Sequence, residues 1–398
     1  MLKEYDVIII GAGPAGLQCA RELAKENIKV LVVEKQKEIG EPNFSTAGTP
    51  EETLKVFDLP QEIAPYKWNK IYLKSANQEF TGIMKENTGY VFDFRKLRQW
   101  LAEDAAKNGA EISVGTTIKE PIFEDGKIVG LNYQGIYSEG QFKAKVVIDA
   151  TGSGAVLARR PELLKPVTRE SAIGLELEMT NLTFPQEDCL YFYLGDYYIP
   201  NGYGWVFPLS PNLGKVGIGR YLIADKKFDL KQGLKDFISK IPWLKDGQSV
   251  EFHSGTLTFS LDFDDFVNDG FMAIGTAGSH VNPLGGEGIR HGMYAAHFAT
   301  EVLKEAFAKN DFSKKKLNKF NHLWHDYYSK NNWKECVALS NYVYSDTNDP
   351  KIDQYIKDLS SLSGDDLFDL LFNYKFLSKL PEISLNILKD TLNKKLNR

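Results

Sequence analysis

The stretch YDVIIIGAGPAGLQCARELAKENIKVLVVEK, from Tyr5 to Lys35, decides the fold. Its apolar run Val7–Ile10 predicts a buried parallel strand, which leads directly into the pattern GxGxxG. A helix with an apolar face and a second apolar strand, Val30–Val33, come after the glycines. A strand, a glycine-rich turn, a helix and a strand in this order are typical of the dinucleotide-binding unit of a doubly wound α/β sheet.

Each glycine of this pattern has its own physical role. Gly11 permits the tight turn, Gly13 lets the backbone approach a pyrophosphate, and Gly16 lets the helix pack closely on the strand. We expect the diphosphate at the helix N-terminus, where unpaired N–H groups and the helix dipole favour negative charge. Glu34 ends the second strand, about twenty residues on, and its carboxylate can accept hydrogen bonds from ribose hydroxyls.

The composition is that of an ordinary globular protein. The chain has 398 residues, enough for about two or three domains, with 43% hydrophobic and 25% charged residues. The net charge of −5 gives no reason to expect nucleic-acid binding. The three scattered cysteines fit neither a metal site nor a disulfide framework, so we expect no bound metal. The N-terminus has no secretory pattern and no apolar run could span a bilayer, which predicts a cytoplasmic protein.

Two later segments have glycine-rich turns of the same kind. VVIDATGSG covers residues 146–154, and GFMAIGTAGSHVNPLGGEGIRHG begins at Gly270. In the second segment we expect a short strand over Phe271–Ile274 and a long amphipathic helix starting around Gly288. Backbone N–H groups at the start of that helix can face the electron-rich pyrimidine edge of a flavin.

Together with the first glycine loop, these segments resemble the FAD domain of the p-hydroxybenzoate hydroxylase superfamily. In that superfamily the three glycine-rich segments are far apart in sequence and meet around one FAD. The resemblance covers the chain from residue 1 to about 310 and implies FAD as the cofactor. The cofactor-binding residues that it implies are Gly11, Gly13, Pro14, Ala15, Gly16, Glu34, Lys35, Ser45, Thr46, Gly48, Arg98, Ile118, Thr151, Gly152, Thr276, Pro283, Gly286, Glu287, Gly288 and Ile289.

A second informative stretch, YGWVFPLSPNLGKVGIG, covers residues 203–219. Because side chains alternate along a strand, Tyr203, Trp205 and Phe207 are expected on one face. We expect the proline at 208 to stop this strand and PLSPNLG to return the chain as a hairpin. Such an aromatic face is either part of a sheet core or the wall of a pocket.

This stretch is similar to the pattern Y-x-W-x-F-P, a spacer, then G-x-G, of the geranylgeranyl reductase family. The resemblance implies a pocket for a long isoprenoid chain, with small glycines that leave room for the chain to slide past. It also implies that the substrate-binding residues are Tyr203, Trp205, Phe207, Pro208, Gly217 and Gly219. Recognition of such a chain rests on apolar burial and rigid aromatic walls, since it offers only apolar surface and π-bonds.

The activity implied by this resemblance is reduction of C=C double bonds in a geranylgeranyl or other polyprenyl chain. Reduced FAD would give a hydride from N5 to one carbon while a proton reaches the other. The sequence leaves the proton donor open among Tyr203, the flavin and a bound water. The electron donor is likewise open between NAD(P)H and ferredoxin, because no second GxGxxG marks a nicotinamide domain.

The chain departs from the family pattern at three places. The flavin loop reads Gly275-Thr276-Ala277 where the family has G-D-A, so a hydroxyl replaces a carboxylate. Ser45 occupies the place of a cysteine. Phe94 occupies the place of a cofactor-binding arginine, which Arg95 or Arg98 could replace, and we assign the role to Arg98.

Three alternative functions share the scaffold. A redox-neutral cyclase of the lycopene cyclase type is one, with Glu176 or Glu178 as its acid. A flavin-dependent monooxygenase or halogenase is the second, although the W-x-W-x-I-P stretch typical of halogenases is not found here. A flavin-bound lipid carrier without turnover is the third.

The predicted organisation has three parts. A discontinuous FAD domain covers residues 1–165 and 265–310, with about 50–85 contributing to the substrate side. An antiparallel substrate domain covers 166–264, and a helical region covers 311–398. Its last segment, 375–398, is basic with a leucine stripe, which is compatible with either membrane-surface contact or packing on the body.

Overall fold

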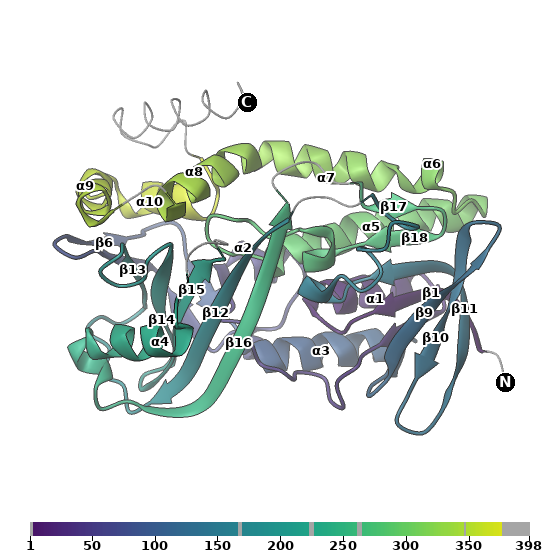
Figure 1. The fold of residues 1–398 in the computed structure, drawn as a ribbon, viewed down its shortest axis with the longest axis horizontal. Coiled ribbons are helices and arrows are strands. Elements are labelled where there is room, and N and C mark those ends of the chain that lie inside the picture. The colour runs from purple at the N-terminus through teal and green to yellow at the C-terminus, as the bar shows by residue number, and fades with distance from the viewer. Residues whose placement is uncertain (1–2, 166–168, 223–226, 261–264, 346–347, 376–398) are drawn as a thin grey trace.

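The computed structural model describes residues 3–165, 169–222, 227–260, 265–345 and 348–375. Two large sheets lie beside one another, and helices run across them (Figure 1). In this view α7 (Lys319–Lys330) runs along the top and α5 (Ile289–Lys309) lies below it. Helices α8 (Trp333–Ser345), α9 (Asp349–Leu359) and α10 (Gly364–Leu371) lie above the second sheet. The fold is the α/β class with an additional antiparallel sheet that the sequence predicts.

The first sheet is built around the predicted dinucleotide unit. Its main strands follow the order β17-β18-β11-β1-β2-β8, and all neighbours except β17 and β18 are parallel. A hairpin of β9 and β10 extends it from β11. The strands are β1 (Lys3–Ile10), β2 (Val30–Val33), β8 (Glu111–Ser113), β9 (Thr117–Glu124), β10 (Lys127–Gln134), β11 (Glu139–Asp149), β17 (Val267–Asn268) and β18 (Phe271–Ala273).

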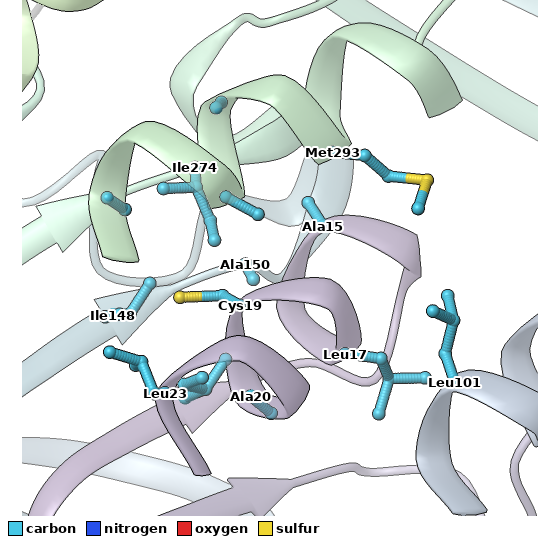
Figure 2. Close-up of a cluster of buried hydrophobic side chains, with 14 of the residues drawn as sticks. Ala15, Leu17, Cys19, Ala20, Leu23, Leu101, Ile148, Ala150, Ile274 and Met293 are labelled. Carbon is cyan, nitrogen blue, oxygen red and sulfur yellow. The ribbon is translucent and has the colours of Figure 1, made fainter. Parts of the chain in front are cut away.

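Both faces of this sheet are covered, which explains why its central strands are apolar throughout. On one face α1 (Pro14–Lys25) packs between α3 (Phe94–Lys107) and α5. Figure 2 shows Leu17 of α1 beside Leu101 of α3, and Ala15 near Met293 of α5. Alternate residues of the same strands, such as Ile8 of β1, belong to a second cluster on the opposite face.

The second sheet follows the order β16-β12-β15-β14-β13-β5-β6 and is antiparallel except between β13 and β5. Helix α4 (Leu230–Ser239) packs on one of its faces. A three-stranded sheet, β3-β7-β4, and the short α2 (Glu52–Val56) complete the body. The strands are β3 (Gly48–Pro50), β4 (Tyr66–Trp68), β5 (Lys70–Lys74), β6 (Glu79–Ile83), β7 (Gly89–Val91), β12 (Arg169–Thr180), β13 (Cys189–Leu194), β14 (Gly202–Ser210), β15 (Leu213–Tyr221) and β16 (Gln248–Ser260).

The aromatic hairpin differs from its prediction at the proline. Strand β14 does not stop at Pro208 but continues to Ser210, and the turn consists of residues 211–212. A register shift between Pro208 and Ser210 accommodates the missing N–H donor, as is usual for proline at a bulge. The strand predicted over Phe271–Ile274 ends one residue early, at Ala273, and the long helix begins at Ile289.

The C-terminal part is helical as far as it is described. After α5, α6 (Lys314–Leu317) and α7 pack against the first sheet's helices, and α8–α10 follow. The basic amphipathic segment predicted over residues 375–398 lies outside the described residues from 376 onward. Among the helices that are described, none combines the length and apolar character needed to cross a bilayer.

Candidate active site

The glycine loop between β1 and α1 has the geometry of a diphosphate cradle. Gly11 has a φ of +105°, and a Cβ there would overlap the carbonyl of Ala150. A Cβ on Gly13, by contrast, would meet nothing within 4 Å, so the space in front of this residue is open. Gly13 is the N-cap of α1 and provides no side-chain cap, which leaves the first N–H groups free for an anion.

Two buried charged side chains hold this loop in place. Glu34 accepts hydrogen bonds from the N–H of Ala12 at 2.8 Å and from the N–H of Gln36 at 2.9 Å. Arg98, only 3% exposed, donates from Nε to the carbonyl of Ala12 at 3.0 Å and from Nη1 to that of Pro42 at 3.1 Å. Arg98 therefore lies at the loop, and its assignment to cofactor binding stays a prediction.

Three glycine-rich segments meet at one edge of the first sheet. Ile10 pairs with Asp149, and Asp149 pairs with Ala273, so the parallel strands β1, β11 and β18 end side by side. The loops after them therefore converge where α/β sheets bind ligands. A Cβ on Gly152 would meet nothing within 4 Å, and the N-cap of α5 at Gly288 has no side-chain cap. These open positions and free N–H groups fit FAD.

Other residues predicted for cofactor binding are spread around this edge. Thr151 donates to the Asp149 carboxylate from its N–H at 2.9 Å and its hydroxyl at 2.6 Å. Lys35 is exposed at the end of β2, and Thr276 lies in the turn after β18. Ile118 is buried on the sheet face opposite to α1, where it packs in the cluster that contains Ile8.

A cavity of about 380 Å³ lies between the flavin loops, the second sheet and the C-terminal helices. Tyr203, Trp205 and Phe207 face it from β14, so these aromatics form a pocket wall as well as part of a core. The predicted cofactor-contacting residues that also line it are Ser45, Thr46, Gly48, Pro283, Gly286, Glu287, Gly288 and Ile289. Helices α8, α9 and α10 close its far end with mostly apolar side chains, among them Val343, Ile356 and Leu371.

The glycines of the hairpin make room for the tryptophan ring, and Gly219 also lines the cavity. Trp205 pairs with Gly217 across β14 and β15, and a Cβ on Gly217 would overlap its indole ring. Gly219 lines the cavity, but a Cβ there would lie 3.1 Å from the same ring. Gly217, which the indole ring covers, and Pro208 are not among the residues that line the cavity.

We predict that Gly217→Ala lowers kcat/KM for a prenyl substrate by about tenfold and destabilises the fold by about 1–3 kcal/mol, because the indole must move. Steady-state kinetics and urea unfolding check these two values. Gly109→Ala is the matched control outside the cavity. The new methyl group has open space around it, but the φ of +103° disfavours alanine, so this variant should lower stability and leave kcat/KM unchanged. A Gly217→Ala variant with unchanged kcat/KM would contradict the steric role.

A buried carboxylate, Glu176, interrupts the apolar lining. Its Oε2 accepts from Trp205 Nε1 at 2.9 Å and from the Thr46 hydroxyl. Burial alone would raise the pKa of Glu176, but Lys215 and these hydrogen bonds more than offset it and lower the pKa. Lys215 donates in turn to the carbonyl of Ser45. Glu176 is therefore a carboxylate at rest, and it can act as an acid only after it takes a proton from a neighbouring group.

A second buried network joins the start of α5 to the segment after α10. Arg290 donates to both carboxylate oxygens of Glu287, at 2.8 Å each, and Tyr374 donates to the same carboxylate at 2.6 Å. Burial opposes the charge on Glu287, but Arg290 and His291 hold its pKa well below the usual value. The Glu287 carboxylate is thus fully occupied, and its backbone is what remains for the flavin side.

Tyr203 is a weak candidate for the proton donor. Its hydroxyl donates to the carbonyl of Gly285 at 2.8 Å, and burial raises its pKa to about 12. It therefore serves better to tie the aromatic wall to the flavin loop than to release a proton.

The fold and site together define an FAD-dependent oxidoreductase with an apolar substrate cavity. Residues 6–160 match the model of the FAD dependent oxidoreductase family, and residues 170–257 match that of the geranylgeranyl reductase catalytic domain. The chain is 31% identical to the digeranylgeranylglycerophospholipid reductase of Haloferax volcanii over 92% of each chain. It is 32% identical to digeranylgeranylglycerophospholipid reductase 3 of Methanosphaera stadtmanae, over 90% of this chain and 92% of that one.

The chain belongs to the geranylgeranyl reductase family, and it is an FAD-dependent reductase of prenyl double bonds. A geranylgeranyl bacteriochlorophyll reductase-like protein from Thermoplasma acidophilum has the same fold, with a TM-score of 0.89, 26% identity and coverage of 98% of this chain and 100% of its own. A flavin-dependent brominase is also similar, with a TM-score of 0.75, but at 18% identity this likeness shows the fold alone. The comparisons thus favour the reductase over the cyclase and halogenase alternatives.

Proposed function

We propose that this chain reduces the geranylgeranyl chains of a digeranylgeranylglycerophospholipid. The observation that carries the proposal is the apolar cavity, which extends from the predicted flavin edge to the C-terminal helices. Relatives named for this substrate, at 31% and 32% identity over nearly the whole chain, support it. An apolar cavity with few polar groups suits a prenyl chain, whose binding depends on buried area and shape.

We assign cofactor binding to the residues predicted for it around the three converging loops. When bound and reduced, FAD supplies the hydride for the double bond. Tyr203, Trp205 and Phe207 orient the alkene and exclude water, which matters because an isolated double bond is a poor hydride acceptor. Since the lipid resides in a bilayer, we also propose that the protein works at a membrane surface. The choice of NAD(P)H or ferredoxin as electron donor stays a prediction.

An anaerobic assay tests this function. We expect the dithionite-reduced protein, given vesicles that contain digeranylgeranylglyceryl phospholipid, to be reoxidised while the lipid gains mass in steps of two hydrogens. Vesicles of the saturated lipid are the control, and they should bind without reoxidation. Unchanged lipid mass with altered chromatographic retention would instead indicate a cyclase. Turnover only with oxygen would indicate a monooxygenase, and tight binding without product a carrier.

A further inference from the structure

A chain of three ionisable side chains leads from the cavity to the surface. Glu176 lines the cavity, and its Oε1 lies 3.5 Å from Nδ1 of His253, which also lines it. Nε2 of His253 lies 2.8 Å from Oε2 of Glu251. The side-chain exposure rises along the chain from 4% for Glu176 to 6% for His253 and 32% for Glu251, so the outer carboxylate is in contact with solvent.

The pairing of two long strands creates this chain. Glu176 of β12 is directly opposite His253 of β16, and Glu178 is opposite Glu251. Directly paired residues on one face of an antiparallel sheet have Cβ atoms about 5 Å apart, which brings their polar ends within hydrogen-bond reach. The three groups therefore have a fixed order that does not depend on a loop.

Reduction of a double bond requires a proton as well as a hydride, and the other ionisable groups around the cavity are poor sources. The carboxylate of Glu287 is occupied by Arg290 and Tyr374. Burial raises the pKa of the cavity tyrosines, to about 12 for Tyr203. Among the described residues that line the cavity, Glu176 and His253 are thus the pair best placed to move a proton.

We propose that Glu176 gives the proton to the prenyl double bond and that His253 reprotonates Glu176 from solvent through Glu251. This rests on the proposed function. The hydride, with its electron pair, comes from the reduced cofactor and bonds to one alkene carbon. The Nδ1 proton of imidazolium His253 passes to the Glu176 carboxylate, and the neutral acid formed in this way gives it to the other carbon, so the π-bond is replaced by two C–H bonds. Glu176 is then a carboxylate again, and His253 is left with a proton on Nε2 alone. Rotation of the ring presents its bare nitrogen to Glu251, through which a proton from solvent restores the imidazolium.

The charges around His253 favour this role. The groups that face it are Glu176 and Glu178 from β12, Glu251 from β16, Lys215 from β15 and, through Glu251, Arg95 of α3. Burial and Lys215 lower its pKa, but the carboxylates of Glu176 and Glu251 outweigh them, so the pKa is raised and the imidazolium persists to higher pH than in a free histidine. The donors that lower the pKa of Glu176 also make its protonated form a stronger acid.

The test compares His253→Gln, Glu176→Gln and Glu251→Gln with the wild-type chain, with His297→Gln as control. His297 is a half-exposed histidine on α5 that pairs with Glu22, away from the cavity. The first readout is the single-turnover reoxidation rate with the prenyl lipid between pH 5 and 10. The second readout needs no turnover. It is the pKa of the His253 imidazole measured by NMR, and the His253 signal is identified because it is absent from the His253→Gln variant. FAD content and melting temperature show that each variant is folded.

We expect the wild-type rate to fall about tenfold per pH unit above the raised pKa of His253, because the imidazolium is lost there. His253→Gln should lower the rate about 100-fold and remove this fall of the rate at alkaline pH. Glu176→Gln should lose as much, and the double variant no more than either, since the two act in series. Glu251→Gln should shift both the alkaline fall of the rate and the NMR pKa of His253 to lower pH, because one carboxylate that raises this pKa is gone. His297→Gln should match the wild type.

Two results would overturn the relay while leaving the proposed function intact: an unchanged rate and pH profile in folded His253→Gln, or an NMR pKa of His253 below the ordinary value. If the wild-type chain fails to reduce the lipid, the proposed function is wrong and the relay falls with it. An equal loss in the His297→Gln control would show that removing any histidine impairs the enzyme, which also contradicts the relay.

Discussion

Gly13→Asp is expected to weaken FAD binding severely without harming the fold. Gly13 is the N-cap of α1, and a new Cβ there meets nothing within 4 Å. Aspartate is a preferred N-cap residue, so the helix should gain a few tenths of a kcal/mol. Its carboxylate would occupy the N–H groups meant for the diphosphate and repel it by about 4 kcal/mol, if the charges are about 4 Å apart near the surface. This corresponds to roughly a thousandfold loss of affinity.

The measurements for this variant are FAD titration of the apoprotein and thermal melting of the apoprotein. Gly13→Asn is the matched control, because it has the same shape and the same capping ability but no charge. It should lose much less affinity than Gly13→Asp. Equal FAD affinity in the two variants would contradict the placement of the diphosphate at the start of α1.

Arg290→Met is expected to destabilise the protein by about 3–5 kcal/mol, because it leaves the Glu287 carboxylate charged, buried and without its main partner. Arg290 is buried and the Glu287 side chain is largely shielded, with side-chain exposures of 5% and 10%. The pKa of Glu287 is lowered in the folded protein, so the pair stabilises above the unfolded carboxyl pKa of about 4.3, and this contribution is lost as the pH falls. The difference in unfolding free energy between wild type and variant should therefore shrink toward low pH.

Urea unfolding at several pH values measures this effect. Lys304→Met, on the same helix, removes an exposed partner of Glu26 and should leave the unfolding free energy almost unchanged. The double variant Glu287→Gln with Arg290→Met should recover part of the loss, because no uncompensated charge remains. An Arg290→Met variant as stable as the wild type would contradict the buried pair.

The parts of the fold that follow from local rules could be predicted from the sequence. The glycine loop is one, because Gly11 and Gly13 are needed within a single turn and their spacing is fixed by that turn. The face of β14 is another, since alternation alone places Tyr203, Trp205 and Phe207 together. The FAD cofactor and the family followed from such local motifs in the right order.

The rest of the site depends on contacts between distant residues. Glu176 and His253 are 77 positions apart and meet through the register of β12 and β16, which no local pattern in either strand reveals. Tyr374 reaches Glu287 from 87 positions away. The packing of Trp205 over Gly217 could have been predicted from the sequence, because a two-residue turn at residues 211–212 sets the register of β14 and β15. It was missed because Pro208 was expected to end the strand.

The hairpin register also limits how the length of this chain can vary. The turn at Pro211 and Asn212 is exposed, and exposed loop tips normally tolerate inserted residues. Here one added residue that slipped the pairing would turn the side chains of one strand to the other face. Trp205 would then stand opposite a residue with a side chain, and the aromatic wall would lose its shape. We therefore expect natural insertions in this protein to avoid the hairpin tip and to accumulate elsewhere on the surface.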